Sequence, residues 1–135
     1  MCGWPSVSAP VLNIDGVRIW IALTPSRGIG VAALNVHVPA NAKVSFSEQR
    51  IKIESSELPS PLYSQFGAYN KGDYRPIGVL SGPLDERFAI ESYEKVRPKE
   101  MQVTLPPVVI NGRSITPAPV AFTLTQKPGL VGLCQ

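Results

Sequence analysis

Alternating apolar and polar residues dominate the first third of the chain. Apolar side chains occupy every second position from Val17 to Leu23, and the same alternation returns from Ala32 to Val38. Successive side chains of a β-strand point to opposite faces, so each run predicts a strand that buries one face. Shorter segments continue the alternation at 44–46, 51–53, 101–105 and 120–124.

Two dipeptides predict tight turns. Asp15-Gly16 and Asn111-Gly112 each separate two apolar segments. Both central residues of a type I′ turn need a positive φ angle, which Gly, Asn and Asp tolerate best. Each dipeptide therefore predicts a β-hairpin. A third connection, residues 24–30, is expected to be a loop between two strands.

Residues 84–96 fit two interpretations. Asp85 and Glu86 at the start of the segment, and Pro98 beyond its end, are typical of helix boundaries. Phe88 and Ile90, in contrast, alternate with polar or small residues as a strand requires. We favour a strand here, with a short helix as the alternative.

Proline is used about twice as often as in an average protein, with 14 prolines and 11 glycines among 135 residues. Because proline disrupts helix interiors, several long helices cannot be placed between these residues. The pattern instead predicts a mainly β protein, an antiparallel β-sandwich of about seven to nine short strands with an Ig-like topology as the default. We expect one domain over 1–135, with an N-terminal linker or tether at 1–10 and a long loop rich in aromatic residues, proline and glycine at 58–83.

Charge and hydropathy narrow the classes of partner. The net charge is +3, and the basic residues are scattered from Arg18 to Lys127. This scatter does not predict a nucleic-acid groove. No run approaches the roughly 20 apolar residues of a membrane-spanning helix. With a single histidine and two cysteines, we expect no metal site and no cofactor.

Residues 24–30, with the sequence TPSRGIG, resemble the cofactor turn of the short-chain dehydrogenases. In that family the turn and a helix N-terminus hold the pyrophosphate of a dinucleotide. This chain departs from the family pattern, because Pro25 replaces the first glycine and an alternating, strand-like run follows the turn. The chain also has no tyrosine followed four positions later by lysine. We therefore interpret the segment as a turn between two strands.

His37 is the only histidine, so a Ser-His-Asp or Cys-His mechanism would have to use it. Strand alternation places His37 on the face opposite Leu34 and Val36, where it is expected to be exposed. The chain contains no Gly-x-Ser-x-Gly motif to supply a nucleophile. We therefore expect no enzymatic activity, and a small hydrolase centred on His37 is the alternative.

Aromatic residues gather in one segment with hydrogen-bonding neighbours. Flat rings that stack, together with polar groups that orient a ligand, are typical of sites for sugars or peptides. In the alternative interpretation, the rings fix a long loop to the body of the protein. The candidate ligand-binding residues are Tyr63, Phe66, Tyr69, Asn70, Tyr74 and Arg75.

The two cysteines lie near the ends of the chain. Cys2, followed by Gly3, resembles the lipid-bearing cysteine of bacterial lipoproteins. A disulfide between Cys2 and Cys134 is the competing hypothesis, because domain ends are often close in space, and it would stabilise the fold by about 4–5 kcal/mol. Residues 105–112 also resemble segments of small bacterial envelope domains. We expect a periplasmic, outer-membrane-anchored or secreted protein, with the cytoplasm as the alternative.

Taken together, these features predict a non-catalytic binding or structural module of a bacterial cell-envelope or secreted protein. Its partner would be another envelope protein or a glycan. The more specific alternative is a carbohydrate- or peptide-binding module that uses residues 63–75.

Overall fold

Strands account for all the regular secondary structure that the computed structural model describes, in residues 7–26, 29–70, 73–90 and 100–123. All pairings between them are antiparallel, which confirms the mainly β, antiparallel fold. The strands are β1 (Val7–Ile14), β2 (Val17–Ser26), β3 (Ile29–Val38), β4 (Lys43–Phe46), β5 (Arg50–Glu54), β6 (Leu62–Asn70), β7 (Asp73–Arg75), β8 (Leu80–Ser81), β9 (Leu84–Ile90), β10 (Glu100–Thr104), β11 (Val108–Ile110), β12 (Arg113–Ile115) and β13 (Val120–Thr123).

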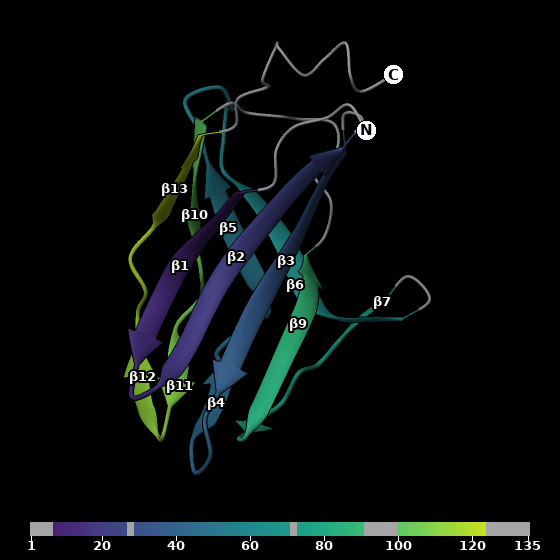
Figure 1. Cartoon of the computed structure of the whole chain (residues 1–135). Coiled ribbons are helices and arrows are strands. Elements are labelled where there is room, and N and C mark those ends of the chain that lie inside the picture. Colours follow the sequence, from purple (N-terminus) through teal and green to yellow (C-terminus); the bar gives the residue numbers. More distant parts are fainter. Residues whose placement is uncertain (1–6, 27–28, 71–72, 91–99, 124–135) are drawn as a thin grey trace.

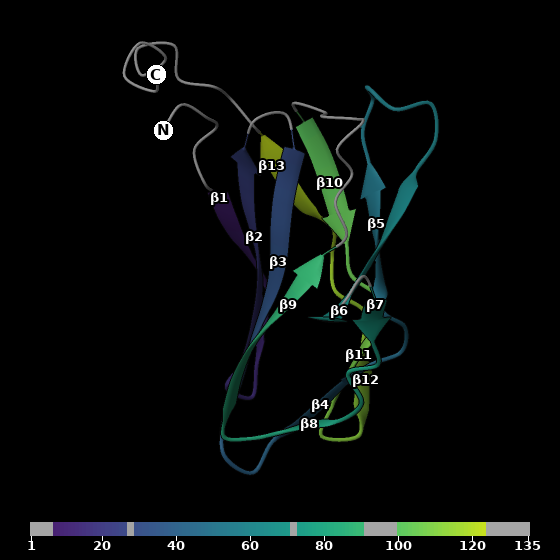
Figure 2. The ribbon, with the colours of Figure 1, turned by 90° about the vertical axis from the view of Figure 1, so that its right-hand side faces the viewer.

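The larger sheet is a nearly closed barrel. Its strand order is β1-β2-β3-β9-β6-β5-β10-β13, with β7 paired to β6 beside this path. The sheet curls until β1 lies next to β13, as Figure 1 and Figure 2 show. This order does not specifically support the expected Ig-like topology. The described chain also has more strands than expected, because several of them are only two to four residues long.

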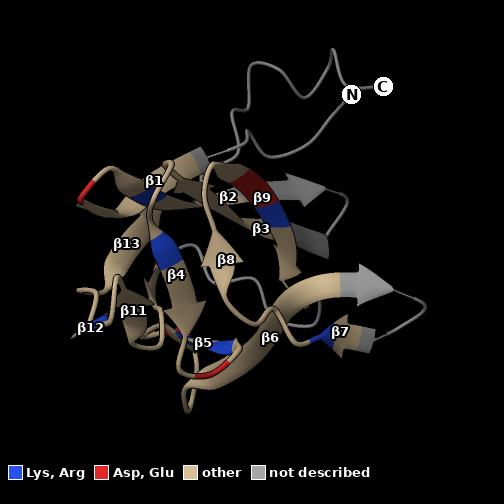
Figure 3. Ribbon diagram, turned by 90° about the horizontal axis from the view of Figure 1, so that it is seen from below, with Lys and Arg blue, Asp and Glu red and all other residues tan. Residues whose placement is uncertain are grey.

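A smaller sheet lies across the lower end of the barrel. It has four strands in the order β12-β11-β4-β8, and Figure 3 shows it from that end. The Asn111-Gly112 turn joins β11 to β12 with φ angles of 50° and 81°, and Asp15-Gly16 joins β1 to β2 with 53° and 82°. Both predicted hairpins are therefore confirmed.

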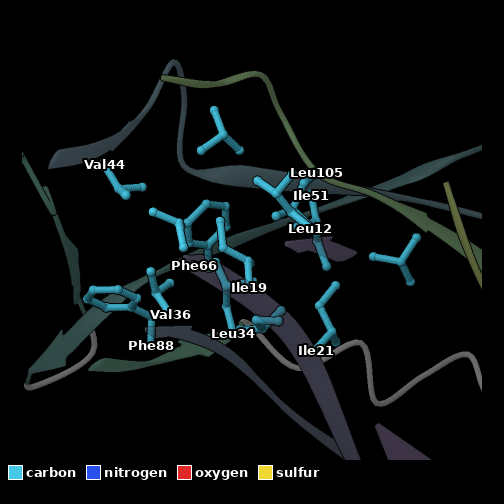
Figure 4. Close-up of a cluster of buried hydrophobic side chains, with 14 of the residues drawn as sticks. Leu12, Ile19, Ile21, Leu34, Val36, Val44, Ile51, Phe66, Phe88 and Leu105 are labelled. Atoms are coloured by element: carbon cyan, nitrogen blue, oxygen red, sulfur yellow. The ribbon is translucent and has the colours of Figure 1, made fainter. Parts of the chain in front are cut away.

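Aliphatic side chains from both sheets fill the interior (Figure 4). The alternation in β2 and β3 is confirmed where side chains are described, because the inward positions are buried and the intervening positions of β2 face outward. The buried inward residues of these two strands are Val17, Ile19, Ile21, Leu34, Val36 and Val38.

Residues 58–83 are not the long loop that their composition predicts. They contain β6, β7 and β8, and β6 pairs with β5, then β9, then β7 along its length. The inward positions of β6 include Ser64, which is buried, next to Phe66. A polar residue at an inward position interrupts the hydrophobic alternation, so the strand is hard to recognise from the sequence.

Other boundaries also differ from expectation. β1 begins at Val7, so residues 7–10 belong to the sheet rather than to a linker, while 1–6 lie outside the described residues. The loop expected at 24–30 is mostly strand, because Ser26 pairs with Ile29 at the ends of β2 and β3. The strand interpretation of 84–96 is confirmed over Leu84–Ile90, and the remainder is outside the described part.

Candidate functional site

Tyr63 is an exposed aromatic residue, with 53% of its surface accessible to solvent. It lies on the outer face of β6, directly opposite Lys52 on β5. The guanidinium carbon of Arg50 lies 4.7 Å from the centre of the Tyr63 ring, within the range of a cation–π interaction. An aromatic ring with polar neighbours therefore stands on an open sheet surface.

The charged groups around this ring occur in pairs of opposite sign. Arg50 Nε lies 3.5 Å from a carboxylate oxygen of Glu48, and Lys52 Nζ lies 3.6 Å from one of Glu54. These four side chains are substantially exposed, so each pair contributes little to stability. Their effect on the surface is a near balance of charge beside the Tyr63 ring.

A cleft of about 310 Å³ adjoins this surface between the start of β5 and the β6–β7 hairpin. Its volume is near the lower end of the range of small-molecule sites. Figure 3 shows β5 running beside β6, and β7 projecting away from the barrel. The cleft is lined by one half-buried ring, that of Tyr74, together with amide and charged groups, Pro76 and the fully buried Phe66; the lining residues are Glu48, Gln49, Arg50, Gln65, Phe66, Tyr74 and Pro76. We call it the hairpin cleft.

The side chain of Gln49 holds the hairpin cleft together. Its Nε2 donates hydrogen bonds to the carbonyl oxygens of Phe66 (3.0 Å) and Arg75 (2.9 Å), and its Oε1 accepts one from the backbone N–H of Ile77 (2.7 Å). The backbone carbonyl of Gln49 also accepts a hydrogen bond from the N–H of Phe66. Both amide donors of this side chain are therefore used on backbone carbonyls.

Gly67 permits these contacts. A Cβ atom at this position would lie 2.7 Å from the carbonyl oxygen of Arg75 and 2.8 Å from Nε2 of Gln49. Both distances are shorter than real Cβ contacts, so a side chain here would push β7 or Gln49 away. The sequence therefore allows the close approach of β6, β7 and Gln49 by placing glycine at this point.

The structure brings together only part of the predicted site. Tyr63 and Arg75 are exposed, and Tyr74 is half-buried in the lining of the hairpin cleft. Phe66 does not belong with them as a surface ring. It is completely buried and packs edge-on against Phe46 at 5.2 Å between ring centres, and Figure 4 shows it among aliphatic core side chains.

Other predicted residues are not placed as side chains. Tyr69 pairs with Tyr74 and Asn70 with Asp73 along the β6–β7 ladder, but the side chains of Tyr69 and Asn70 are outside the described part. Cys2 and Cys134 also lie outside the described residues, so the lipidation and disulfide hypotheses stay predictions.

The predicted site leaves out five residues that line the hairpin cleft: Glu48, Gln49, Arg50, Gln65 and Pro76. Gln49, Arg50 and Gln65 gave no motif, and the pairing of Arg50 with Gln65 follows only from the register of β5 and β6. A usable signal existed for Arg50, because it alternates with the apolar positions Ile51 and Ile53 and so must face outward.

His37 lies on a different wall of the barrel. Its Nδ1 is 2.6 Å from a carboxylate oxygen of Asp85, and the two residues are direct neighbours across β3 and β9. The His37 side chain is 29% exposed and that of Asp85 is 77% exposed. The pair joins two strands on the outer surface.

A larger cavity of about 480 Å³ crosses the other end of β5, β10 and β13. Its aromatic lining residue, Phe122, is 4% exposed, so it offers little ring surface to a ligand. Ser55 and Glu57 brace this end, since Ser55 Oγ donates to the carbonyl of Glu100 and the N–H of Glu100 donates to Glu57. The hairpin cleft is the better candidate because an exposed ring adjoins it.

Neither a metal site nor a membrane-spanning helix is present among the described residues. They contain no group of three or more His, Cys, Asp or Glu side chains that could hold a metal ion. They also contain no helix with the length and hydropathy needed to cross a membrane. The chain matches no protein-family model, no curated protein and no solved structure.

Proposed function

We propose that this chain is a non-catalytic binding module of a bacterial cell-envelope or secreted protein, and that it binds a neutral glycan at Tyr63 and the hairpin cleft. The envelope or secreted setting is supported by the Cys2-Gly3 sequence and by the resemblance of residues 105–112 to segments of small bacterial envelope domains. The glycan is supported by the chemistry of the surface.

The observation that carries the proposal is the exposed Tyr63 ring beside a shaped, polar cleft. A sugar ring has an apolar face, which stacks on an aromatic ring, and hydroxyl groups, which amides and charged groups can orient. Gln65, Arg50 and Glu48 supply such groups along the cleft. Because the nearby charges are paired, the surface favours a neutral sugar over an acidic or basic one.

A panel of neutral oligosaccharides and unstructured peptides tests this proposal. Cello-, malto- and chito-oligosaccharides would be titrated by calorimetry, with the peptides as the competing class. We expect binding to a neutral oligosaccharide, weakened about tenfold by Tyr63→Ala or Tyr74→Ala through loss of a stacked ring. Tyr63→Phe should retain most of the affinity, because the ring remains.

Arg113→Gln is the matched control for Arg50→Gln. Both arginines form exposed ion pairs of similar length, 3.6 Å for Arg113 with Asp15 and 3.5 Å for Arg50 with Glu48. Only Arg50 lines the cleft, so only Arg50→Gln should weaken oligosaccharide binding. Binding of peptides alone, or oligosaccharide binding that survives both tyrosine substitutions, would refute the glycan site.

A further inference from the structure

Gln49 contacts three separate segments with one side chain. Its amide reaches Phe66 in β6, Arg75 in β7 and Ile77 after β7, over 2.7 to 3.0 Å. Gln49 itself precedes β5. A single amide therefore connects the start of β5 to both strands of the hairpin and to the chain that leaves it.

The anchored backbone groups flank the walls of the hairpin cleft. Tyr74 directly precedes Arg75, and Pro76 stands between Arg75 and Ile77. Tyr74 and Pro76 form a wall of the cleft. The Gln49 amide fixes this wall through hydrogen bonds to the adjacent backbone groups of Arg75 and Ile77. β7 has only three residues and pairs only with β6 within the described sheet, so it has little other backbone support.

We infer that Gln49 is the positioning residue of the hairpin cleft, which fixes Tyr74 and Pro76 in the orientation that accepts the glycan. This inference rests on the proposed function. A cleft fixed before binding avoids the entropy cost of ordering a loop around the ligand. Gln49 acts through the two wall residues, and contact with the ligand is not required.

Gln49→Met removes the three side-chain hydrogen bonds while keeping a side chain of similar length. Titrated with the tightest-binding oligosaccharide of the panel, this variant should bind about tenfold more weakly than the wild type, because part of the binding free energy is then spent on ordering the cleft walls. Gln102→Met is the matched control, because Gln102 is exposed on β10 and does not line the hairpin cleft. It should leave the affinity unchanged.

Gln49→Glu gives a signature that a merely structural role would not produce. The new carboxylate would face the carbonyl oxygens of Phe66 and Arg75, which repel its charged form and raise its pKa above the usual range. Affinity should therefore be weak at pH 7 and recover as the pH falls through that pKa, because the protonated group regains one donor. Glu48, Arg50, Tyr74 and Arg75 lie around this position in both proteins, so the wild-type pH profile is the baseline for the comparison.

Hydrogen exchange provides a readout that does not need a ligand. In Gln49→Met, the amide of Ile77 should exchange faster, while amides of the β2–β3 ladder keep their protection. Unchanged exchange at Ile77 would overturn the inference, as would wild-type affinity in Gln49→Met when Tyr63→Ala has lost binding. If Tyr63→Ala and Tyr74→Ala both bind normally, the glycan site itself fails, which is a different result.

Discussion

At the level of single residues, the hairpin cleft depends on the absence of a side chain at Gly67 as much as on the side chains that line it. The contact distances there leave no room for a methyl group between β6, β7 and Gln49. Since Gln49 also anchors the cleft walls, a change at Gly67 should affect both stability and the proposed binding.

We predict that Gly67→Ala destabilises the fold by about 1–3 kcal/mol, the usual cost of overpacking, and weakens oligosaccharide binding. Chemical denaturation should show a lower midpoint at an unchanged slope. Gly78→Ala is the comparison. Its Cβ would meet no atom, although its φ of 70° costs an alanine about 1–2 kcal/mol. A Gly67→Ala protein that binds as well as Gly78→Ala would contradict this account.

Among the elements, the β11–β12 hairpin is tied to its neighbour by its own turn residue. Asn111 Oδ1 accepts a hydrogen bond from the N–H of Lys43 at 2.9 Å, and the N–H of Asn111 donates to the carbonyl of Lys43 at 3.0 Å. Asn111 also has the positive φ that the turn needs. One residue thus closes a hairpin and fixes it to β4.

These two roles of Asn111 can be separated by substitution. Asn111→Gly keeps the positive φ but loses the side-chain acceptor, and should cost about 1 kcal/mol. Asn111→Ala loses both and should cost about 2–3 kcal/mol. In the other turn, Asp15→Gly loses only an exposed ion pair and should cost less than about 1 kcal/mol. Thermal unfolding measures all three, and equal stability of the glycine and alanine variants would contradict the conformational role.

For the whole molecule, the barrel and the smaller sheet meet at two phenylalanines. Phe66 comes from β6 and Phe46 from β4, and their rings are nearly perpendicular at 80°. Phe66 is fully buried, whereas Phe46 is partly buried. The contact therefore couples the two sheets, with one ring inside the core and the other packed against it.

We predict that Phe66→Ala lowers the free energy of unfolding by about 3–5 kcal/mol, as expected for a large buried ring. Phe46→Ala should cost less, because its ring is partly exposed. A double-mutant cycle with Phe46→Leu and Phe66→Leu, milder changes that preserve folding, should give a coupling of about 0.5–1.5 kcal/mol. Additive effects would show that the two sheets are not joined by this contact.

Local structure follows from the sequence more readily than the arrangement of strands. Asp15-Gly16 and Asn111-Gly112 set φ angles within a few residues, and the alternation in β2 and β3 sets their buried faces. The pairing of β3 with β9 joins His37 to Asp85, 48 positions away. The residues near His37 in the sequence do not indicate Asp85 as its partner, because this pairing depends on how the strands of the whole sheet are arranged.

The candidate site also combines residues that the sequence indicates with residues that only the tertiary structure identifies. Composition alone places Tyr63, Tyr74 and Arg75 in the candidate set, and it also includes Phe66, whose ring the alternation of β6 turns into the core. Gln49 has no signal in the sequence, because its importance comes from three backbone groups that tertiary structure brings to it.

The junction between β1 and β13 has a mechanical consequence. These strands end the hydrogen-bonded order of the large sheet, so they lie side by side without a shared ladder in the described structure. The barrel can widen along this line without breaking backbone pairing elsewhere. β5 and β6 stand in the interior of the strand order, and β10 lies between β5 and β13. Opening along this line would therefore leave the β5–β6 and β6–β7 ladders of the candidate site intact.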